Sequence, residues 1–315
     1  MHKTILVIGG TYFIGRIFAR LAARTGNYLL HTVNRGRYPL KDDGITQITC
    51  DRHDTETLAR LLRGKEWDAV VDFCAYEPGD ISSLLQTIPG RTGQYIYIST
   101  CSVYAPGGVY PKSEASPHLE GGGGDPGLEY AFKKSVLEKE AVPACTAKGA
   151  HLTILRPAFV YGPLNYAPRE AYYFDRLLRR EPIPVPLDAT GRFQFVYVKD
   201  IARAIMACIA NPAAYDEDFI LSAPDRLDYA SYLDVLASVH GRRPETVPVT
   251  VRQVYDENIP LPFPLDSDEL YDGTKAEKEL GIEYTPFIEG IRESYDVYMS
   301  VHGSQGEDKR RNSDG

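Results

Sequence analysis

The first half of the chain alternates short apolar runs with amphipathic stretches of helical period. Short apolar runs separated by helices are typical of βαβ units, so this alternation predicts a parallel sheet with helices on both faces. The predicted strands span Thr4–Ile8, Leu29–Val33, Gly44–Thr49, Ala69–Phe73, Gln94–Ser99 and Leu152–Leu155. The predicted helices span Ile14–Arg24, Thr55–Arg63, Ile81–Thr87 and Tyr130–Ala141. We therefore expect an α/β fold with a doubly wound parallel sheet (a Rossmann fold), in which ligands bind beyond the carboxyl ends of the strands.

The pattern loosens after about residue 162, where prolines become frequent. We interpret residues 1–162 as mainly a dinucleotide-binding domain and residues 163–302 as mainly a smaller C-terminal substrate-binding lobe. Within the second part, Phe195–Ala210 has the pattern of a strand and a helix that return to the main sheet. Residues 303–315 are polar and charged without periodicity, which predicts a disordered tail.

Composition and charge narrow the classes of function. The 315 residues carry a formal net charge of -8, which argues against a general binder of nucleic acid. The apolar run at the N-terminus is too short for a signal peptide or a membrane span. Five scattered cysteines form neither a CxxC pair nor a zinc spacing. The simplest expectation is a reduced, cytoplasmic protein with no metal site.

A glycine-rich turn follows the first predicted strand and opens the first predicted helix. Residues 9–15 read GGTYFIG, and glycines here let the backbone bend tightly and approach a pyrophosphate at the helix N-terminus. The spacing is similar to the GxxGxxG turn of short-chain dehydrogenases, with Tyr12 in place of the middle glycine. The side chain of Tyr12 must then point away from the phosphates. The alternative is a strand–helix turn that binds no cofactor.

The end of the second predicted strand bears on the type of cofactor. An acidic residue at position 34 would accept hydrogen bonds from the ribose hydroxyls of NAD, but Asn34 is neutral. Arg35 and Arg37, joined by Arg16, are suited to pairing with a 2′-phosphate, which favours NADP over NAD. Asp51, just past the third strand, is placed to hold the adenine amino group, although a local ion pair with its neighbour Arg52 is an equal alternative.

Tyr130 and Lys134 are four residues apart, which places both side chains on one face of a helix. An ammonium group beside a phenol favours the ionised phenol, so we expect the pKa of Tyr130 to fall from about 10 towards neutral pH. Such a tyrosine can take a proton from an alcohol, or give one to a carbonyl, while a cofactor carries hydride. The pair alone is weak evidence, because tyrosine and lysine are common on amphipathic helices.

Further segments agree in order and spacing with the motifs of one family. They are residues 99–104 (STCSVY), 130–138 (YAFKKSVLE), 156–163 (RPAFVYGP), 195–200 (FVYVKD) and 275–281 (KAEKELG). With the glycine turn, they resemble the SSxxVYG, YGxxKxxxE, RPxxVYGP, F(I/V)xVxD and KAxxxLG patterns of the extended (epimerase/dehydratase type) short-chain dehydrogenase/reductase family. The resemblance runs from about residue 4 to residue 298. It implies a NAD(P)-dependent enzyme that moves hydride at a secondary alcohol or ketone, most readily of a nucleotide-linked sugar.

The resemblance also implies roles by position. Thr100 would hydrogen-bond the reacting oxygen, Tyr130 would be the general acid and base, and Lys134 would hold the nicotinamide ribose and lower the pKa of the phenol. The implied cofactor-binding residues are Gly9, Thr11, Tyr12, Phe13, Ile14, Gly15, Asn34, Arg35, Asp51, Arg52, Cys74, Ala75, Ser99, Tyr130, Lys134 and Pro157. The implied substrate-binding residues are Tyr76, Cys101, Ser102, Phe159 and Arg192.

Departures from the family pattern narrow the chemistry. Sugar 4,6-dehydratases of the family carry an Asp-Glu pair after the catalytic threonine, whereas this chain has Cys101 and Ser102, so a dehydratase is disfavoured. Phe159 stands where sugar epimerases commonly place an asparagine, and Arg192 is one residue out of line with their arginine. An epimerase and a dehydrogenase need the same residues, so both stay open. The first alternative is an NADPH-dependent carbonyl reductase acting on a smaller metabolite.

A second alternative comes from the turn itself. GGTxFIG with a residue other than glycine at its fourth position, here Tyr12, resembles a subgroup that includes plant chloroplast stem-loop RNA-binding proteins. The net negative charge disfavours RNA as a partner. Family members often form homodimers through the helix that carries the tyrosine and lysine, and Phe132, Val136 and Leu137 give this helix apolar positions that face either a second copy or the chain's own core.

Overall fold

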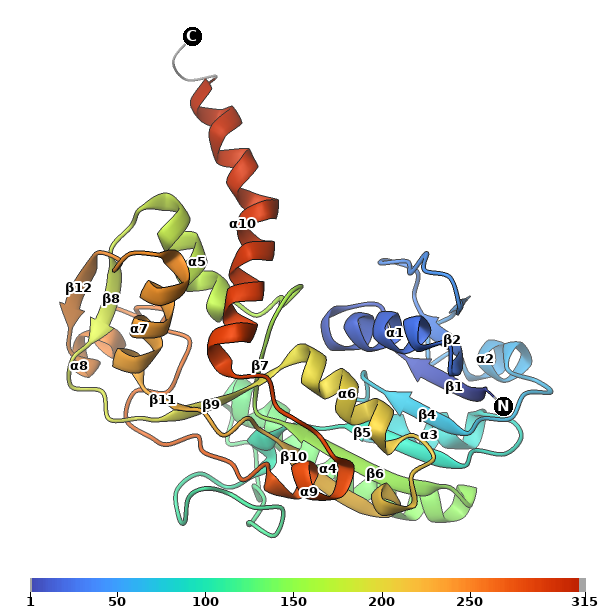
Figure 1. Cartoon of the computed structure of the whole chain (residues 1–315). Coiled ribbons are helices and arrows are strands. Elements are labelled where there is room, and N and C mark those ends of the chain that lie inside the picture. The colour runs from blue at the N-terminus through green and yellow to red at the C-terminus, as the bar shows by residue number, and fades with distance from the viewer. Residues whose placement is uncertain (1, 312–315) are drawn as a thin grey trace.

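A central sheet of seven strands organises the N-terminal domain (Figure 1). The computed structural model describes residues 2–311. The strands are β1 Lys3–Ile8, β2 Tyr28–Asn34, β3 Ile45–Thr49, β4 Ala69–Asp72, β5 Gln94–Ile98, β6 His151–Pro157 and β10 Glu217–Leu221. They lie in the order β10-β6-β5-β4-β1-β2-β3, and each neighbouring pair is parallel. The predicted doubly wound parallel sheet is confirmed.

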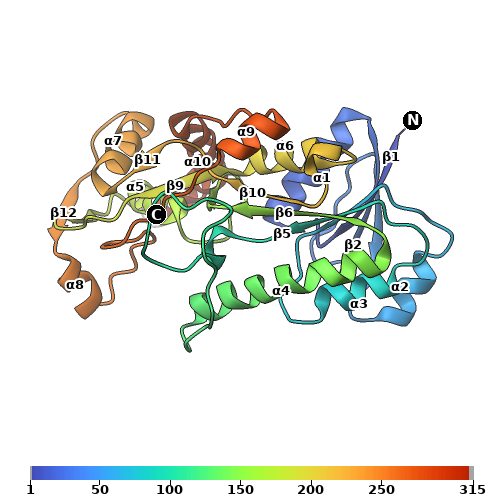
Figure 2. The ribbon, with the colours of Figure 1, turned by 90° about the horizontal axis from the view of Figure 1, so that it is seen from below.

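Helices cover both faces of this sheet, which explains why its central strands are apolar along their length. On one face lie α1 Phe13–Thr25 and α6 Val198–Cys208, which pack against each other (Figure 2). On the other face lie α2 Thr55–Leu61, α3 Asp80–Thr87 and α4 Pro126–Lys148. Leu58, Leu84 and Leu137 bring these three helices into one buried cluster with the strands. Leu137 therefore faces the chain's own core.

A smaller lobe follows, built around two short sheets. One sheet holds β7 Phe159–Tyr161, β9 Phe193–Tyr197 and β11 Arg226–Leu227, and the other holds β8 Ile183–Pro186 and β12 Thr246–Val249. Its helices are α5 Glu170–Arg179, α7 Tyr229–His240, α8 Val251–Asp256 and α10 Phe287–Arg311, while α9 Thr274–Leu280 lies against β10. Stacked rings form the core of the lobe, with Phe193 and Phe263 centred 4.7 Å apart. No helix within residues 2–311 is long and apolar enough to cross a bilayer.

Three predicted elements differ from the structure. The strand within Phe195–Ala210 does not join the main sheet: it is β9 of the lobe, and β10 supplies the returning strand. The helix around Tyr130 begins earlier, because Asp125 accepts hydrogen bonds from the first backbone N–H groups and Pro126 suits the first helical position. The tail expected to be disordered is helical as far as Arg311, and residues 312–315 lie outside the described residues.

Candidate active site

The glycine turn between β1 and α1 is closely packed. A Cβ atom at Gly10 would lie 2.5 Å from Val7 Cγ1, and one at Gly15 would lie 2.7 Å from Gly10 Cα, so neither position has room for a side chain. Gly9 has a φ of +96°, which favours glycine. The N-terminus of α1 has no side-chain cap and no acidic residue in its first turn. Its free N–H groups and helix dipole therefore suit an anion such as a pyrophosphate.

A cavity of about 440 Å³ lies in front of this turn. Eight of the predicted cofactor-binding residues line it: Gly9, Thr11, Tyr12, Asn34, Arg35, Asp51, Arg52 and Cys74. Asn34 accepts a hydrogen bond from the Gly36 N–H at 2.8 Å, while its buried Nδ2 has no partner among the described residues. A buried donor without a partner is costly, so Nδ2 is suited to an oxygen of a bound ligand. Together with the uncapped helix, it makes the cavity fit a dinucleotide.

Arg52 lines the cavity, but it does not form the ion pair with Asp51 that the sequence analysis gave as an alternative. Its guanidinium is buried, pairs with Asp72 at 3.0 Å and donates to the Asp80 carbonyl at 2.8 Å. The reason is that Asp72 is fully buried in β4 and needs a cationic partner. Asp51 instead accepts from the His53 N–H, and this bond keeps the pKa of Asp51 below its usual range.

Lys134 is held by the backbone rather than aimed at Tyr130. The ammonium group donates to the carbonyls of Ala75 at 3.1 Å and Ile98 at 2.9 Å, and the rings of Tyr76 and Tyr97 cover it. The side chain is buried, and burial lowers the pKa of Lys134 to about 8. Lys134 therefore ties α4 to the ends of β4 and β5.

The expected fall in the pKa of Tyr130 was wrong. Tyr130 keeps 42% of its surface exposed, so a substrate can reach it. Burial of the phenol, with a smaller contribution from the phenol of Tyr166, raises its pKa to about 12. The opposing positive charge comes from Arg169, because the ammonium of Lys134 is taken up by two carbonyls.

Arg169 is a site residue that the sequence analysis missed. It precedes α5, and its guanidinium stacks over the Phe159 ring at 5.0 Å and donates to the Val160 carbonyl at 3.1 Å. It takes part in none of the ion pairs found within residues 2–311, and burial lowers its pKa. No motif marked this position. In the sequence, Arg169 could be noticed only as the one arginine in the short segment that follows the RPAFVYGP stretch.

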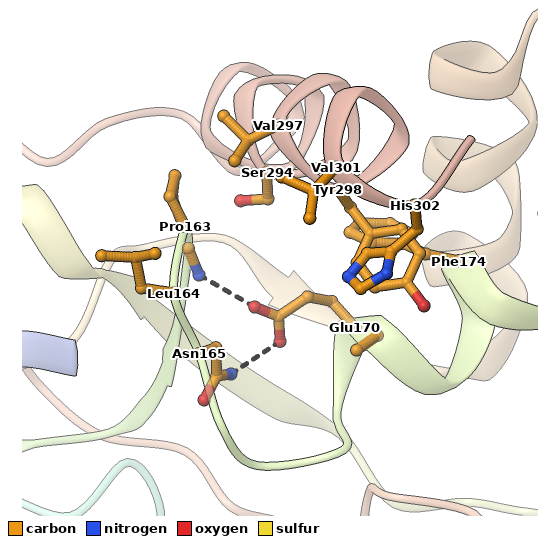
Figure 3. A pocket seen from close by; sticks show the side chains of 12 residues that line it. Pro163, Leu164, Asn165, Glu170, Phe174, Ser294, Val297, Tyr298, Val301 and His302 are labelled. Atoms are coloured by element: carbon orange, nitrogen blue, oxygen red, sulfur yellow. Dashed lines mark hydrogen bonds between the residues drawn. The ribbon is translucent and has the colours of Figure 1, made fainter. Parts of the chain in front are cut away.

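A buried carboxylate holds the segment that carries Arg169. Glu170 accepts from the Gly162 N–H and from Asn165 Nδ2, each at 2.9 Å, beside a pocket of about 180 Å³ between this segment, α5 and α10 (Figure 3). Burial raises the pKa of Glu170. The segment between Gly162 and Glu170 is thus fixed at both ends.

Thr100 caps the short 3-10 turn that follows β5. Its hydroxyl accepts from the Ser102 N–H and donates to Ser102 Oγ, both at 3.2 Å. Cys101 is buried, and its thiol donates to the Arg156 carbonyl at 3.1 Å, so it does not face the open cleft. The hydroxyl of Ser99 also binds within the protein, because it donates to Glu138 at 2.5 Å.

The other predicted cofactor-binding residues lie apart from the cavity lining. Gly15 and Phe13 are packed inside the turn, Ile14 belongs to the first turn of α1, Ala75 offers its carbonyl to Lys134, and Pro157 ends β6. Among the predicted substrate residues, Tyr76 lines the cavity and its ring lies 6.5 Å from that of Tyr130. Phe159 packs on Phe195 and Phe263, and Arg192 is paired with Asp268.

An ion-pair network fixes α4 against the sheet. Arg156 of β6 donates to both carboxylate oxygens of Glu138, at 3.0 and 2.8 Å, and also pairs with Asp218. Both Arg156 and Glu138 are buried, and Ser99 completes the contacts of Glu138. The segments that carry Thr100 and Tyr130 are thereby locked to one another.

Comparison with known proteins finds one family model that matches part of the chain, and relatives that are similar to most of it. Residues 80–221 match the family model described as the NAD dependent epimerase/dehydratase family. The chain is 23% identical over 279 residues to the UDP-glucose 4-epimerase of Vibrio cholerae, covering 80% of each chain. It is 29% identical over 314 residues to the chloroplast stem-loop binding protein of 41 kDa b of Arabidopsis thaliana, covering 94% of this chain and 79% of the relative.

Solved structures share the epimerase/dehydratase fold. The UDP-glucose 4-epimerase of Thermotoga maritima with UDP-glucose superposes with a TM-score of 0.76 at 19% identity, over 95% of this chain and 99% of that one. The UDP-glucuronic acid 4-epimerase of Bacillus cereus in complex with UDP-glucuronic acid and NAD gives a TM-score of 0.76 at 18% identity, with the same coverage of 95% and 99%. At these identities the likeness establishes the fold.

We expect Lys134 to make the stability of this chain depend on pH. Its pKa is about 8 in the folded chain, whereas an unfolded lysine titrates near about 10.4. Between these values the unfolded state binds more protons, so the contribution of Lys134 to the free energy of unfolding rises with pH. In urea unfolding, the wild type should gain more than about 1 kcal/mol relative to Lys134→Met between about pH 8 and pH 10. A difference that stays constant over this range would contradict the assignment.

Proposed function

We propose that this chain is an NAD(P)-dependent oxidoreductase or epimerase that moves hydride at a secondary alcohol or ketone carbon of a nucleotide-linked sugar. One observation carries the proposal: Tyr76 lines the cavity at the glycine turn, and its ring centre lies 6.5 Å from that of Tyr130, the tyrosine that the family pattern makes the acid and base. The catalytic side chains follow the carboxyl ends of the strands, where ligands of doubly wound sheets bind.

Residues of the cavity would hold the dinucleotide. The N-terminus of α1 and the turn at Gly9 and Thr11 suit the pyrophosphate, the unpartnered Nδ2 of Asn34 suits a ribose oxygen, and Asp51 suits the adenine amino group. The ammonium of Lys134 has three donors, of which two bind carbonyls, so the third is left for the nicotinamide ribose. A bound nicotinamide would supply the chemistry of accepting and returning hydride at the substrate carbon.

The chain's own residues would move the proton. With a pKa of about 12, Tyr130 holds its proton at neutral pH and can give it to a carbonyl oxygen. In the opposite direction Tyr130 must act as a phenolate, and the guanidinium of Arg169 is the charge that favours this form. The hydroxyl of Thr100 would hydrogen-bond the reacting oxygen. Lys134 would serve chiefly by fixing α4, and so the position of Tyr130.

Arg169 supports a substrate that carries negative charge. A partly buried guanidinium without a carboxylate partner is suited to binding a phosphate or carboxylate. Arg169→Gln should raise the KM for a UDP-sugar by roughly 10- to 100-fold, because a charge-assisted hydrogen bond is worth about 1.5–3 kcal/mol. Steady-state kinetics measures this effect. Arg179→Gln, which removes an exposed arginine of α5 paired with Asp175, is the control that should leave KM unchanged.

Elimination of water is disfavoured. The residues that follow Thr100 are a buried thiol bonded to a carbonyl and a serine, and neither can supply the acid and base that a 4,6-dehydratase needs. Burial also raises the pKa of Cys101 far above its usual value, so the thiol holds its proton.

The second candidate is a carbonyl reductase that uses NADPH, and Asn34 with Arg35 favours this cofactor. Asn34→Asp should lower the affinity for NADP by about tenfold or more and leave the affinity for NAD equal or higher, because a carboxylate repels the 2′-phosphate and accepts from ribose hydroxyls. Fluorescence titration with NADH and NADPH measures both. Asn27→Asp, in the exposed loop before β2, makes the same change of charge and should alter neither affinity.

RNA binding is the third candidate, favoured by the exposed rings of Tyr12 and Tyr38 beside Arg35 and Arg37. The formal net charge of -8 weighs against it. Salt-sensitive retention of RNA in a filter-binding assay, unaffected by Tyr130→Phe, would support this function.

The main proposal is tested on the purified full chain. Mass spectrometry identifies any bound dinucleotide, and chromatography after incubation with UDP-glucose and other UDP-sugars detects interconversion. Conversion without net consumption of cofactor favours the epimerase, and steady NADPH consumption with a ketone favours the reductase. A chain that neither carries nor binds NAD or NADP would contradict both.

A further inference from the structure

Three tyrosines from separate segments stack beside the cofactor cavity. The ring of Tyr12, in the glycine turn, lies between those of Tyr38 and Tyr166, with centroids 5.2 and 5.1 Å apart and planes within 20° and 25°. Tyr38 belongs to the loop between β2 and β3, and Tyr166 to the segment between β7 and α5. The edge of the stack is completed by Phe13, whose ring meets that of Tyr166 at 87°. We refer to Tyr12, Tyr38 and Tyr166 as the tyrosine stack.

The stack joins the two parts of the molecule across the cleft. Tyr12 and Tyr38 line the cavity of the N-terminal domain, whereas Tyr166 comes from the segment that leads into the lobe. The phenol of Tyr166 also contributes to raising the pKa of Tyr76 and of Tyr130, which places it near the catalytic end of the cleft. The tyrosine stack therefore runs from the lining of the cavity, at Tyr12 and Tyr38, to Tyr166 near Tyr76 and Tyr130.

The segment that carries Tyr166 is anchored. Glu170 binds the Gly162 N–H and Asn165 Nδ2, Asn165 Oδ1 accepts from the Ala167 N–H at 3.0 Å, and Arg169 binds the Val160 carbonyl. Figure 3 shows Glu170 between Asn165 and the backbone of this segment. Tyr166 is thus presented to Tyr12 from a fixed support, although its own ring is largely exposed.

We propose that the tyrosine stack closes the cofactor cleft and retains the dinucleotide through successive turnovers. This inference rests on the proposed function and selects between a dehydrogenase and an epimerase. A dehydrogenase must exchange its cofactor after each turnover, because the substrate is oxidised and the nicotinamide leaves reduced. An epimerase ends each cycle with the cofactor in its original redox state and gains from keeping it. The stack therefore assigns this chain to the enzymes that recycle their cofactor.

Tyr12, which stands in place of the middle glycine of the turn, joins the other two rings of the stack. A glycine at position 12 would leave Tyr38 and Tyr166 without the ring that joins them. Aromatic pairs each contribute enough, beyond their buried area, to change a rate or equilibrium several-fold, and Tyr12 takes part in two pairs. Tyr12 thus supplies both stacking contacts by which the tyrosine stack would close the cleft.

Release of NADH from the intact chain tests the proposal. The protein is loaded with NADH and mixed in a stopped-flow instrument with excess NAD, and the loss of NADH fluorescence gives the dissociation rate. We expect Tyr166→Ala and Tyr12→Gly to release NADH about tenfold or more faster than the wild type. Tyr166→Phe, which keeps the ring, should release it at the wild-type rate.

The matched control is Tyr215→Ala, because Tyr215 stacks on His151 with centroids 4.0 Å apart at the far side of the sheet. It should leave NADH release unchanged. Circular dichroism and thermal unfolding check that each variant is folded.

Wild-type release rates in Tyr166→Ala and Tyr12→Gly would overturn the proposal, and so would a Tyr166→Phe variant as fast as Tyr166→Ala. If such variants still interconvert UDP-sugars, only the inference about closure fails. A wild type with no affinity for NADH or NAD would remove the proposed function and the inference with it.

Discussion

Replacing Tyr130 with phenylalanine should lower turnover of a UDP-sugar by roughly 10²- to 10⁴-fold, the usual contribution of a positioned acid or base. The hydroxyl of Tyr130 is the group that gives or takes the proton. Among the described residues of α4, no other side chain near Tyr76 offers an equivalent hydroxyl. The change deletes a single oxygen that forms no hydrogen bond among residues 2–311. Dinucleotide affinity and the free energy of unfolding should therefore stay close to those of the wild type.

Two measurements separate this loss from a structural effect. Fluorescence titration should give the same Kd for NADH in wild type and variant, and urea unfolding should give the same midpoint. Tyr255→Phe removes an exposed phenol of α8 and should leave turnover unchanged. Substantial turnover in Tyr130→Phe would remove the proposed mechanism, even if the dinucleotide still bound.

Replacing Glu138 with alanine should have the largest effect on stability. The change strands the buried guanidinium of Arg156 with Asp218 as its remaining carboxylate, and it leaves the hydroxyl of Ser99 without its acceptor. Removing one member of a buried ion pair costs about 3–5 kcal/mol, because the other charge stays buried and uncompensated. Urea unfolding measures the difference.

Glu138→Gln keeps the shape of the side chain and should fall between wild type and alanine. The control is Asp256→Ala, which removes an exposed carboxylate paired with Arg252 on α8 and should cost less than about 1 kcal/mol. A loss in Glu138→Ala no greater than in this control would contradict the structural role of the network.

The sheet was predictable because each strand is a short run of apolar residues next to a helix of clear period. The assignment of the returning strand failed, since β9 and β10 are both short and apolar, and their choice of partner is a long-range property. The start of α4 could have been predicted from nearby residues. Asp125 followed by Pro126 is a signal for a helix N-terminus, and the apolar pattern alone does not include it.

The sequence was sufficient to predict which types of residue lie at the site, but only some of the contacts that their side chains make. The spacing of Tyr130 and Lys134 gives a shared face of the helix, but it says nothing about the carbonyls of Ala75, after β4, and Ile98, at the end of β5, which bind the ammonium. The ion pair of Arg52 with Asp72 could not be predicted for the same reason, because the two residues are distant in sequence. Arg169 carries no motif and emerges from the fold alone.

Because β10 adds to β6 after the chain has passed through the lobe, the two parts cannot be separated by one cut near residue 162. A fragment that ended there would lack the outermost strand, and β6 would become an open edge with unpaired backbone groups and the apolar side chains of Leu152, Ile154 and Leu155. Such an edge invites pairing with other chains. Expression of residues 1–162 by themselves should therefore yield aggregates, whereas the whole chain closes that edge with its own later residues.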